Sequence, residues 1–138
     1  MTALDAVLEA ARREAEALMI DRIDFYRPGP DVFDRESGTT VPGPRLVTFY
    51  TGKARVKVAQ LADAQVQAGE RELTLRQYRV SIPFSMVLPV AGERPQPGDL
   101  IDVTDAEELR MVGMRLWVKG VQYSSTATAW RIIAEDRS

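Results

Sequence analysis

Apolar side chains recur every three or four positions near the start of the chain, which is the spacing of one helical face. This spacing predicts a helix over residues 2–19, in which Thr2 can cap the N-terminus and Asp5 approximates a capping box. The apolar face is narrow and rich in alanine, so it suits close packing against a flat surface. That surface can belong to the same domain or to a neighbouring subunit. The members of the face are Leu4, Val7, Leu8, Ala11, Ala15 and Leu18.

The period of the pattern changes from 3.6 to 2 after residue 20. Ile23 and Phe25 fall on one side of the segment IDRIDFYR, while Arg22, Asp24 and Tyr26 fall on the other. Such alternation predicts a strand with one buried face. The next segment, residues 28–44, is rich in Gly and Pro, so we expect a long loop or a splayed hairpin there. Its large apolar side chains include Val32 and Phe33.

The middle of the chain continues the strand pattern with two interruptions. Residues 46–50 are expected to form a strand that breaks at Thr51-Gly52, and the segment that follows points Ala54, Val56 and Val58 inward. Residues 59–71 are expected to form a second long loop. Residues 70–82 are expected to form one strand, and the switch of its apolar phase near Arg76-Gln77 predicts a β-bulge.

The last third of the chain is typical of a β-meander. Strands are expected over residues 100–103, 111–119, 121–124 and 129–135, with an acidic turn at 105–108 and breaks at Gly113 and Gly120. The whole pattern predicts a mainly β fold, a small β-barrel or sandwich of six to seven strands with an N-terminal α-helix and long loops. Residues 1–19 would form a helical arm, and residues 20–138 a single barrel-like domain.

Composition narrows the function classes. The chain has 138 residues, no cysteine and no histidine, so it offers no thiol nucleophile, no imidazole base and no Cys/His zinc site. No nucleotide-binding or hydrolase motif occurs either, and we therefore expect no enzymatic activity, no catalytic residue and no cofactor. The charged N-terminal segment is unlike a signal peptide, and no segment has the apolar length of a membrane span. We accordingly expect an intracellular protein, or part of an assembly built inside the cell.

Acidic residues cluster in one segment of the last third. A calcium site would need oxygen ligands at tight alternate positions with a glycine in the loop. No glycine follows Asp105, and Asp102 falls in a predicted strand, so a solvated turn is favoured over a metal site. The cluster consists of Asp99, Asp102, Asp105, Glu107 and Glu108.

Basic residues form a row on the outward face of the strand at residues 53–58. Lysine and arginine spaced along a strand can neutralise the phosphates of a nucleic acid, although a solvated sheet face gives the same pattern. The net charge of −2 argues against strong binding through bulk charge. The row consists of Lys53, Arg55 and Lys57, and Arg71, Arg76 and Arg79 are placed to flank it.

The order of five segments resembles that of the head-closure proteins of tailed phages. They are MIDRIDFYRPG, YTGKARVKV, YRVSIPFS, PQPGDLIDVT and VGMRLWVKGVQYSSTATAWRIIAE. The chain is also similar to an actinobacterial phage and prophage family from the neck-gene cluster. The resemblance runs from about Leu4 to Glu135 and depends on the order of short motifs. It departs from the family where Tyr123-Ser124-Ser125-Thr126 stands at a place at which histidine is common.

The resemblance implies a head-to-tail connector of the stopper or head-closure type, located in the virion neck and assembled in the host cytoplasm. Such subunits form rings of six or twelve copies between the portal and adaptor proteins above and the tail terminator and tail tube below. They retain the packaged double-stranded DNA and dock the tail. The candidates for contact with DNA in the channel are Lys53, Arg55, Lys57, Gln65, Gln67 and Arg71. The candidates for contact with other subunits or partners are Leu4, Val7, Leu8, Ala11, Val32, Phe33, Trp117 and Trp130.

Two alternatives stay open. The chain could be a tail terminator or another minor neck or tail protein in the same virion. It could also be a small barrel that binds nucleic acid or a peptide. From the residues alone, Trp117 and Trp130 are core or subunit-contact aromatics, and the sequence does not distinguish these two roles.

Overall fold

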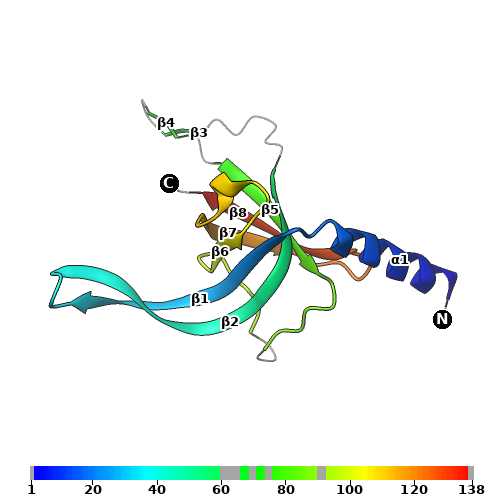
Figure 1. Ribbon diagram of the computed structural model, residues 1–138, viewed down its shortest axis with the longest axis horizontal. Helices are drawn as coiled ribbons and strands as arrows, with labels where there is room; N and C mark the ends of the chain where they lie inside the picture. The colour runs from blue at the N-terminus through cyan, green and yellow to red at the C-terminus, as the bar shows by residue number, and fades with distance from the viewer. Residues whose placement is uncertain (1, 60–65, 69–70, 74–75, 90–92, 137–138) are drawn as a thin grey trace.

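Six antiparallel strands of the chain close into a barrel in the order β1-β2-β5-β8-β7-β6 (Figure 1). The computed structural model describes residues 2–59, 66–68, 71–73, 76–89 and 93–136. The barrel strands are β1 (Asp21–Asp34), β2 (Thr39–Val58), β5 (Arg76–Pro83), β6 (Leu100–Asp105), β7 (Arg115–Gln122) and β8 (Ala129–Asp136). The remaining elements are α1 (Ala3–Ala17), a separate two-stranded sheet of β3 (Val66–Ala68) and β4 (Arg71–Leu73), and the 3₁₀ helix η1 (Leu109–Met111). The predicted mainly β fold with an N-terminal helix is confirmed. Neither α1 nor η1, the helices of the described residues, has the length and apolar character that a membrane span requires.

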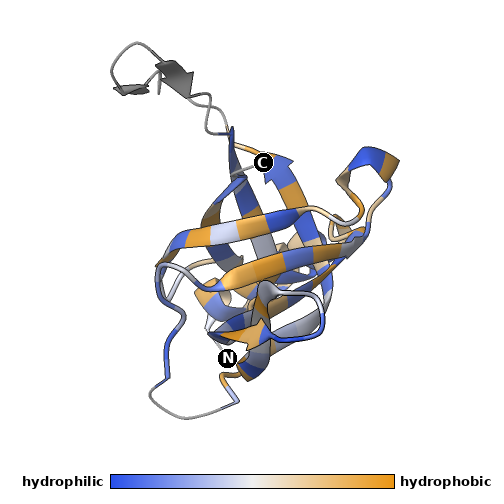
Figure 2. Ribbon diagram, turned by 90° about the vertical axis from the view of Figure 1, so that its left-hand side faces the viewer, coloured by the Kyte–Doolittle hydropathy of each residue, from blue (hydrophilic) through white to orange (hydrophobic). Residues whose placement is uncertain are grey.

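The barrel interior is filled by every second side chain of its strands, as the alternating pattern predicts. Figure 2 shows apolar and polar segments alternating along these strands. Phe25 of β1 is fully buried in this core and contacts Phe49 of β2, with the ring centroids 5.0 Å apart. The largest fully buried apolar side chains are Phe25, Ile23, Ile82, Ile101, Leu116, Ile132, Val80, Val103 and Val118.

The predicted inward face of β2 is right for Ala54 and Val56 but wrong for Val58. The first two are buried, whereas Val58 is 59% exposed. Pairing of β1 with β2 ends at Asp21 and Ala54, so Val58 lies at the open end of the barrel with β5 as its remaining neighbour. Among the described strands, none besides β5 pairs with β2 at this position.

Residues 28–44, expected to form a long loop or a splayed hairpin, form a hairpin. β6 pairs with β1 only as far as Tyr26 and Leu100, whereas β1 and β2 continue to pair with each other to Asp34 and Thr39. Residues 28–44 therefore leave the barrel as a two-stranded ribbon, which we call the hairpin arm (Figure 1). The close pairing at Gly29 and Gly43 requires glycine, because a Cβ on either residue would clash with a carbonyl oxygen of the opposite strand.

The predicted strand break at Thr51-Gly52 is wrong, because β2 runs through both residues. Gly52 pairs with Ile23 of β1 and has a φ of 152°. A Cβ on Gly52 would lie 2.9 Å from the hydroxyl oxygen of Tyr50, and that hydroxyl donates to the carbonyl of Lys53 at 2.6 Å. The glycine therefore admits a tyrosine ring against the strand and does not end the strand.

The strand predicted over residues 70–82 is two strands. β4 pairs with β3, whereas β5 pairs with β2 and β8, so the change of apolar phase marks a change of partner. Residues 74–75, between them, lie outside the described residues. The β3–β4 pair also replaces part of the loop expected at 59–71.

The predicted break at Gly120 is wrong as well. β7 runs from Arg115 to Gln122 and pairs with β8 on both sides of Gly120, with a register shift between Val118 and Gly120. This shift places Lys119 at a β-bulge, which absorbs the irregularity without ending the strand. Met111, expected in a strand, belongs to η1.

α1 begins as predicted. The hydroxyl of Thr2 accepts from the backbone N–H of Asp5 and the carboxylate of Asp5 accepts from the backbone N–H of Thr2, both at 3.1 Å. This is a reciprocal capping box. The helix contains no fully buried residue, but Leu8, Ala11 and Ala15 are half-buried, so the barrel covers its apolar face only in part.

Candidate functional site

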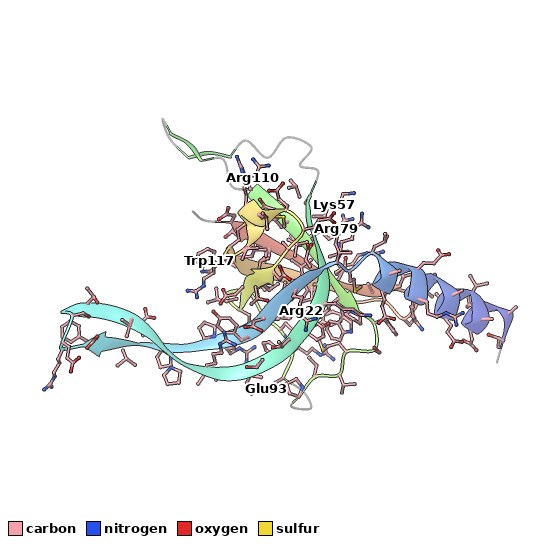
Figure 3. All side chains as sticks on the ribbon, in the orientation of Figure 1. Arg22, Lys57, Arg79, Glu93, Arg110 and Trp117 are labelled. Carbon is pink, nitrogen blue, oxygen red and sulfur yellow. The ribbon has the colours of Figure 1, made fainter. Side chains whose placement is uncertain are left out.

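Four basic side chains gather on the outer face of the barrel beside α1. Lys57 of β2 pairs with Arg79 of β5. Two residue pairs further along the ladder, Ser81 of β5 pairs with both Arg55 of β2 and Arg131 of β8. Outward side chains at these positions share one face of the sheet. Figure 3 shows Lys57 and Arg79 side by side near the base of α1.

These four residues line a groove of about 320 Å³ between the barrel and α1, which we call the basic groove. Among the described residues that line it, Glu14 alone is acidic. The surplus of positive charge suits an anion such as a phosphate or a carboxylate. The groove is formed by Ala11, Glu14, Ala15, Leu18, Arg55, Lys57, Arg79, Ser81, Thr128, Ala129 and Arg131.

The predicted basic row is only partly gathered in this groove. Lys53 lies on the same outer face, but its ammonium group pairs with the Glu16 carboxylate of α1 at 3.6 Å. Arg131 is an additional member of the groove that the basic row did not include; its alternation with buried Ile132 on a strand is the signal for an outward position. Gln65 lies outside the described residues. Gln67 of β3 pairs with Glu72 of β4, and Arg71 of β4 pairs with Ala68 of β3; the side chains of Gln67 and Arg71 lie outside the described structure.

A second groove, of about 470 Å³, lies at the end of the barrel where β7 connects to β8; we call it the aromatic groove. Trp130 packs edge-to-face on Tyr123, with the ring centroids 5.6 Å apart. The predicted subunit-contact candidate Trp130 thus lines a surface groove, while Trp117 is half-buried on the outside of β7 (Figure 3). The groove is formed by Phe84, Met86, Gln122, Tyr123, Ser124, Ser125, Ala127, Ala129 and Trp130.

Arg12 joins α1 to the aromatic groove. Its guanidinium lies 3.6 Å from the centre of the Phe84 ring, a cation–π contact, and donates to the carbonyls of Ser125 and Ala127, each at 3.1 Å. These bonds fix the β7–β8 connection against the C-terminal half of α1. No sequence motif marks this groove. The available signal was a pair of aromatic residues, Phe84 and Tyr123, directly after strand ends.

The predicted contact residues on the two arms are largely exposed. Leu4 and Val7 of α1 are 59% and 63% exposed, whereas Leu8 and Ala11 are half-buried. Val32 and Phe33, at the far end of the hairpin arm, are 49% and 60% exposed. The structure places these two sets at opposite ends of the molecule (Figure 1).

Three members of the predicted acidic cluster, Asp99, Asp102 and Glu108, pair with different arginines. The Asp99 carboxylate, 2% exposed, accepts from Arg27 Nε at 2.9 Å, and the Asp102 carboxylate accepts from Arg115 Nε at 2.9 Å. Glu108 pairs with Arg110 at the surface. Among the described residues, no three potential ligands lie together in a group that could hold a metal ion.

Ion pairs and burial also set the pKa values at the base of the hairpin arm. The hydrogen bond with Asp99 raises the pKa of Arg27, and the hydrogen bond with Asp102 raises the pKa of Arg115. Burial, followed by its 2.8 Å hydrogen bond to Asp102, raises the pKa of the Tyr26 phenol. At neutral pH the arginines stay charged and the phenol stays neutral, so the base of the arm is held by fixed partners.

A family model described as "Family of unknown function (DUF6093)" matches residues 11–135. The chain belongs to this family. No curated protein matches the chain, and no solved structure matches it. The DUF6093 match begins inside α1 and ends in β8, so it includes the hairpin arm and both grooves, and it leaves out Leu4 and Val7.

Proposed function

We propose that the chain is a structural subunit of a tailed-phage neck, a head-to-tail connector of the stopper type that assembles into a ring. In this role it would sit between the portal or adaptor and the tail, retain the packaged DNA and dock the tail. The order of segments in the sequence, which resembles that of head-closure proteins, supplies the biological context. The observation that carries the proposal is a closed barrel with two arms that project from opposite ends.

The closed barrel limits how such a chain can associate. Closure gives each barrel strand two neighbours, so no strand of the barrel is left unpaired along the whole of one side for the addition of another chain. The arms, in contrast, expose large apolar side chains. Contact with other subunits is therefore expected through the arms, which suits a repeating ring contact between two different surfaces.

The basic groove fits the same role. A ring that surrounds DNA needs basic side chains that meet phosphates without gripping the duplex. Lys57 and Arg79 would supply such contacts if this face lines the channel. The slight negative net charge of the chain keeps the overall attraction weak.

Deletion of the gene from its phage tests the proposal. We expect filled heads that lose their DNA, together with separate tails of normal length, and rescue by the wild-type gene supplied in trans. Joined, infectious virions without this protein would contradict the proposal. Tails of irregular length beside DNA-retaining heads would instead indicate the tail-terminator position.

The basic groove also favours a second candidate, a nucleic-acid-binding module. If its four basic side chains contact phosphates, the affinity for duplex DNA should fall with salt with a log–log slope of about −3 to −4. Lys57→Glu with Arg79→Glu should remove this binding, while Lys119→Glu, on the outside of β7, should leave it unchanged. The groove contains no aromatic side chain among its described residues, so base stacking adds nothing. No binding at low salt would exclude this candidate.

A further inference from the structure

The aromatic groove and the tip of the hairpin arm have matching chemistry. We propose that the hairpin tip of one copy, residues 30–41, binds in the aromatic groove of a second copy, with the Phe33 ring between Phe84 and Trp130. This contact deepens the proposed function and rests on it, because only an assembling subunit needs such a contact.

The hairpin tip lacks the packing that a stable ribbon requires. A two-stranded hairpin alone is at best marginally stable in water. Beyond Tyr26, the described part of the arm pairs only with itself, and Val32, Phe33 and Val41 are exposed. Insertion of these side chains into an apolar groove would remove them from water and order the tip.

Charge favours the same pairing. The tip carries Asp31, Asp34 and Glu36 around a single basic residue, Arg35. The described residues that line the aromatic groove include no carboxylate, and three arginines lie around it. Arg12 stacks on Phe84, the Arg94 guanidinium lies 5.8 Å from the centre of the Tyr123 ring, and Arg131 donates to Thr128 next to the groove. An acidic tip in a groove with basic surroundings is steered into place and held in one register.

The geometry requires the two surfaces to come from different copies. The hairpin arm points away from the barrel at one end, while the β7–β8 connection lies beside α1 toward the other end (Figure 1). An arm therefore cannot reach the groove of its own barrel. A contact between two different surfaces repeats from copy to copy, and it gives a ring if the rotation closes.

Chemical crosslinking of the full-length chain tests the contact on a clean background, because the chain has no native cysteine. The double variant Phe33→Cys/Ser124→Cys would be treated with a short bismaleimide at about 1 mM protein, where an association of only ~4 kcal/mol is still half-populated. We expect a ladder of dimers, trimers and larger species. The matched control is Phe33→Cys/Leu109→Cys, which places the second thiol on η1, away from the groove, and should give no ladder.

The outcomes are decisive in both directions. Monomers alone, a product that stops at dimers, or an equal ladder from the control would overturn the contact. Phe33→Asp should weaken self-association by about 30-fold, the loss typical of a central contact residue, whereas Val58→Asp, equally exposed at the other end of β2, should leave it unchanged. The crosslinking experiment needs no virion. If gene deletion gives heads that leak DNA but crosslinking gives no ladder, this contact is contradicted and the proposed function is not. If gene deletion leaves joined virions but crosslinking still gives the ladder, the proposed function is contradicted and this contact is not.

Discussion

The two halves of strand β1 have the same backbone conformation but opposite surroundings. Residues 21–26 lie in the barrel wall between β2 and β6, and Phe25 is fully buried. Residues 28–34 pair with β2 alone, and Phe33 is 60% exposed. The same residue type on one strand thus meets a close-packed core at one position and solvent at the other.

This difference separates stability from assembly. The inner half contributes side chains to a core whose members support one another, and its loss should unfold the chain. The outer half contributes nothing to that core, yet it keeps two large apolar side chains exposed at its end. Exposed apolar side chains gathered on a projecting element indicate a contact with another molecule. The barrel therefore acts as the rigid base from which the arm is presented.

Truncation of the two phenylalanines should give the largest contrast. Phe25→Ala should lower the free energy of unfolding by about 3–5 kcal/mol, because it leaves a cavity in the centre of the barrel. Phe33→Ala should change it by less than about 0.5 kcal/mol, because the side chain contacts mainly water. Urea unfolding followed by circular dichroism measures both values. A comparable loss from Phe33→Ala would mean that the arm is part of the folded core.

The sequence predicts the inner half of β1 better than the outer half, for a physical reason. Alternation of Ile23 and Phe25 with polar residues reports burial against a sheet, and this signal predicted the barrel wall correctly. The outer half has no such alternation, because neither of its faces is buried within one chain. Its Gly and Pro residues were therefore compatible with a loop as well as with a hairpin.

The same limit applies to the grooves. The basic row on β2 was evident from alternation, but its meeting with Arg79 and Arg131 depends on which strands are neighbours. Strand order is set by long-range pairing, and local residue patterns do not encode it. The aromatic groove combines residues from the ends of β5 and β7, so it too follows from barrel closure.

The ion pair at the junction of the two halves sharpens the comparison. Arg27 lies where β1 leaves the barrel, and its guanidinium pairs with buried Asp99, which also accepts from the backbone N–H of Gln96 at 2.8 Å. Arg27→Met should lower the free energy of unfolding by about 3 kcal/mol, since it leaves a buried carboxylate without its cation. Urea unfolding measures this loss, and amide hydrogen exchange across residues 28–44 reports whether the arm loosens with it.

Arg110→Met provides the matched control for this variant. Arg110 also pairs with a carboxylate, that of Glu108, but both side chains lie at the surface. Its replacement should leave the unfolding midpoint unchanged, because exposed ion pairs contribute little. An equally small effect of Arg27→Met would show that the base of the arm is not held by this pair.

The capping box of α1 gives the smallest and most local effect. Thr2→Ala should speed amide exchange in the first turn by about fivefold, the equivalent of ~1 kcal/mol for a lost N-cap, while Thr2→Ser should preserve the cap.

The same cap makes the start of α1 sensitive to pH. Hydrogen bonding with Thr2, chiefly with its backbone and next with its side chain, lowers the pKa of the Asp5 carboxyl. A lowered pKa stabilises the helix start above the ordinary aspartate pKa, and this contribution is lost as the pH falls through the lowered value. Acid should therefore fray the first turn of the wild-type helix and have less effect in Thr2→Ala. Because α1 buries no residue, neither change should move the urea midpoint of the barrel; a shift there would mean that the helical arm, unlike the hairpin tip, belongs to the stability of the core.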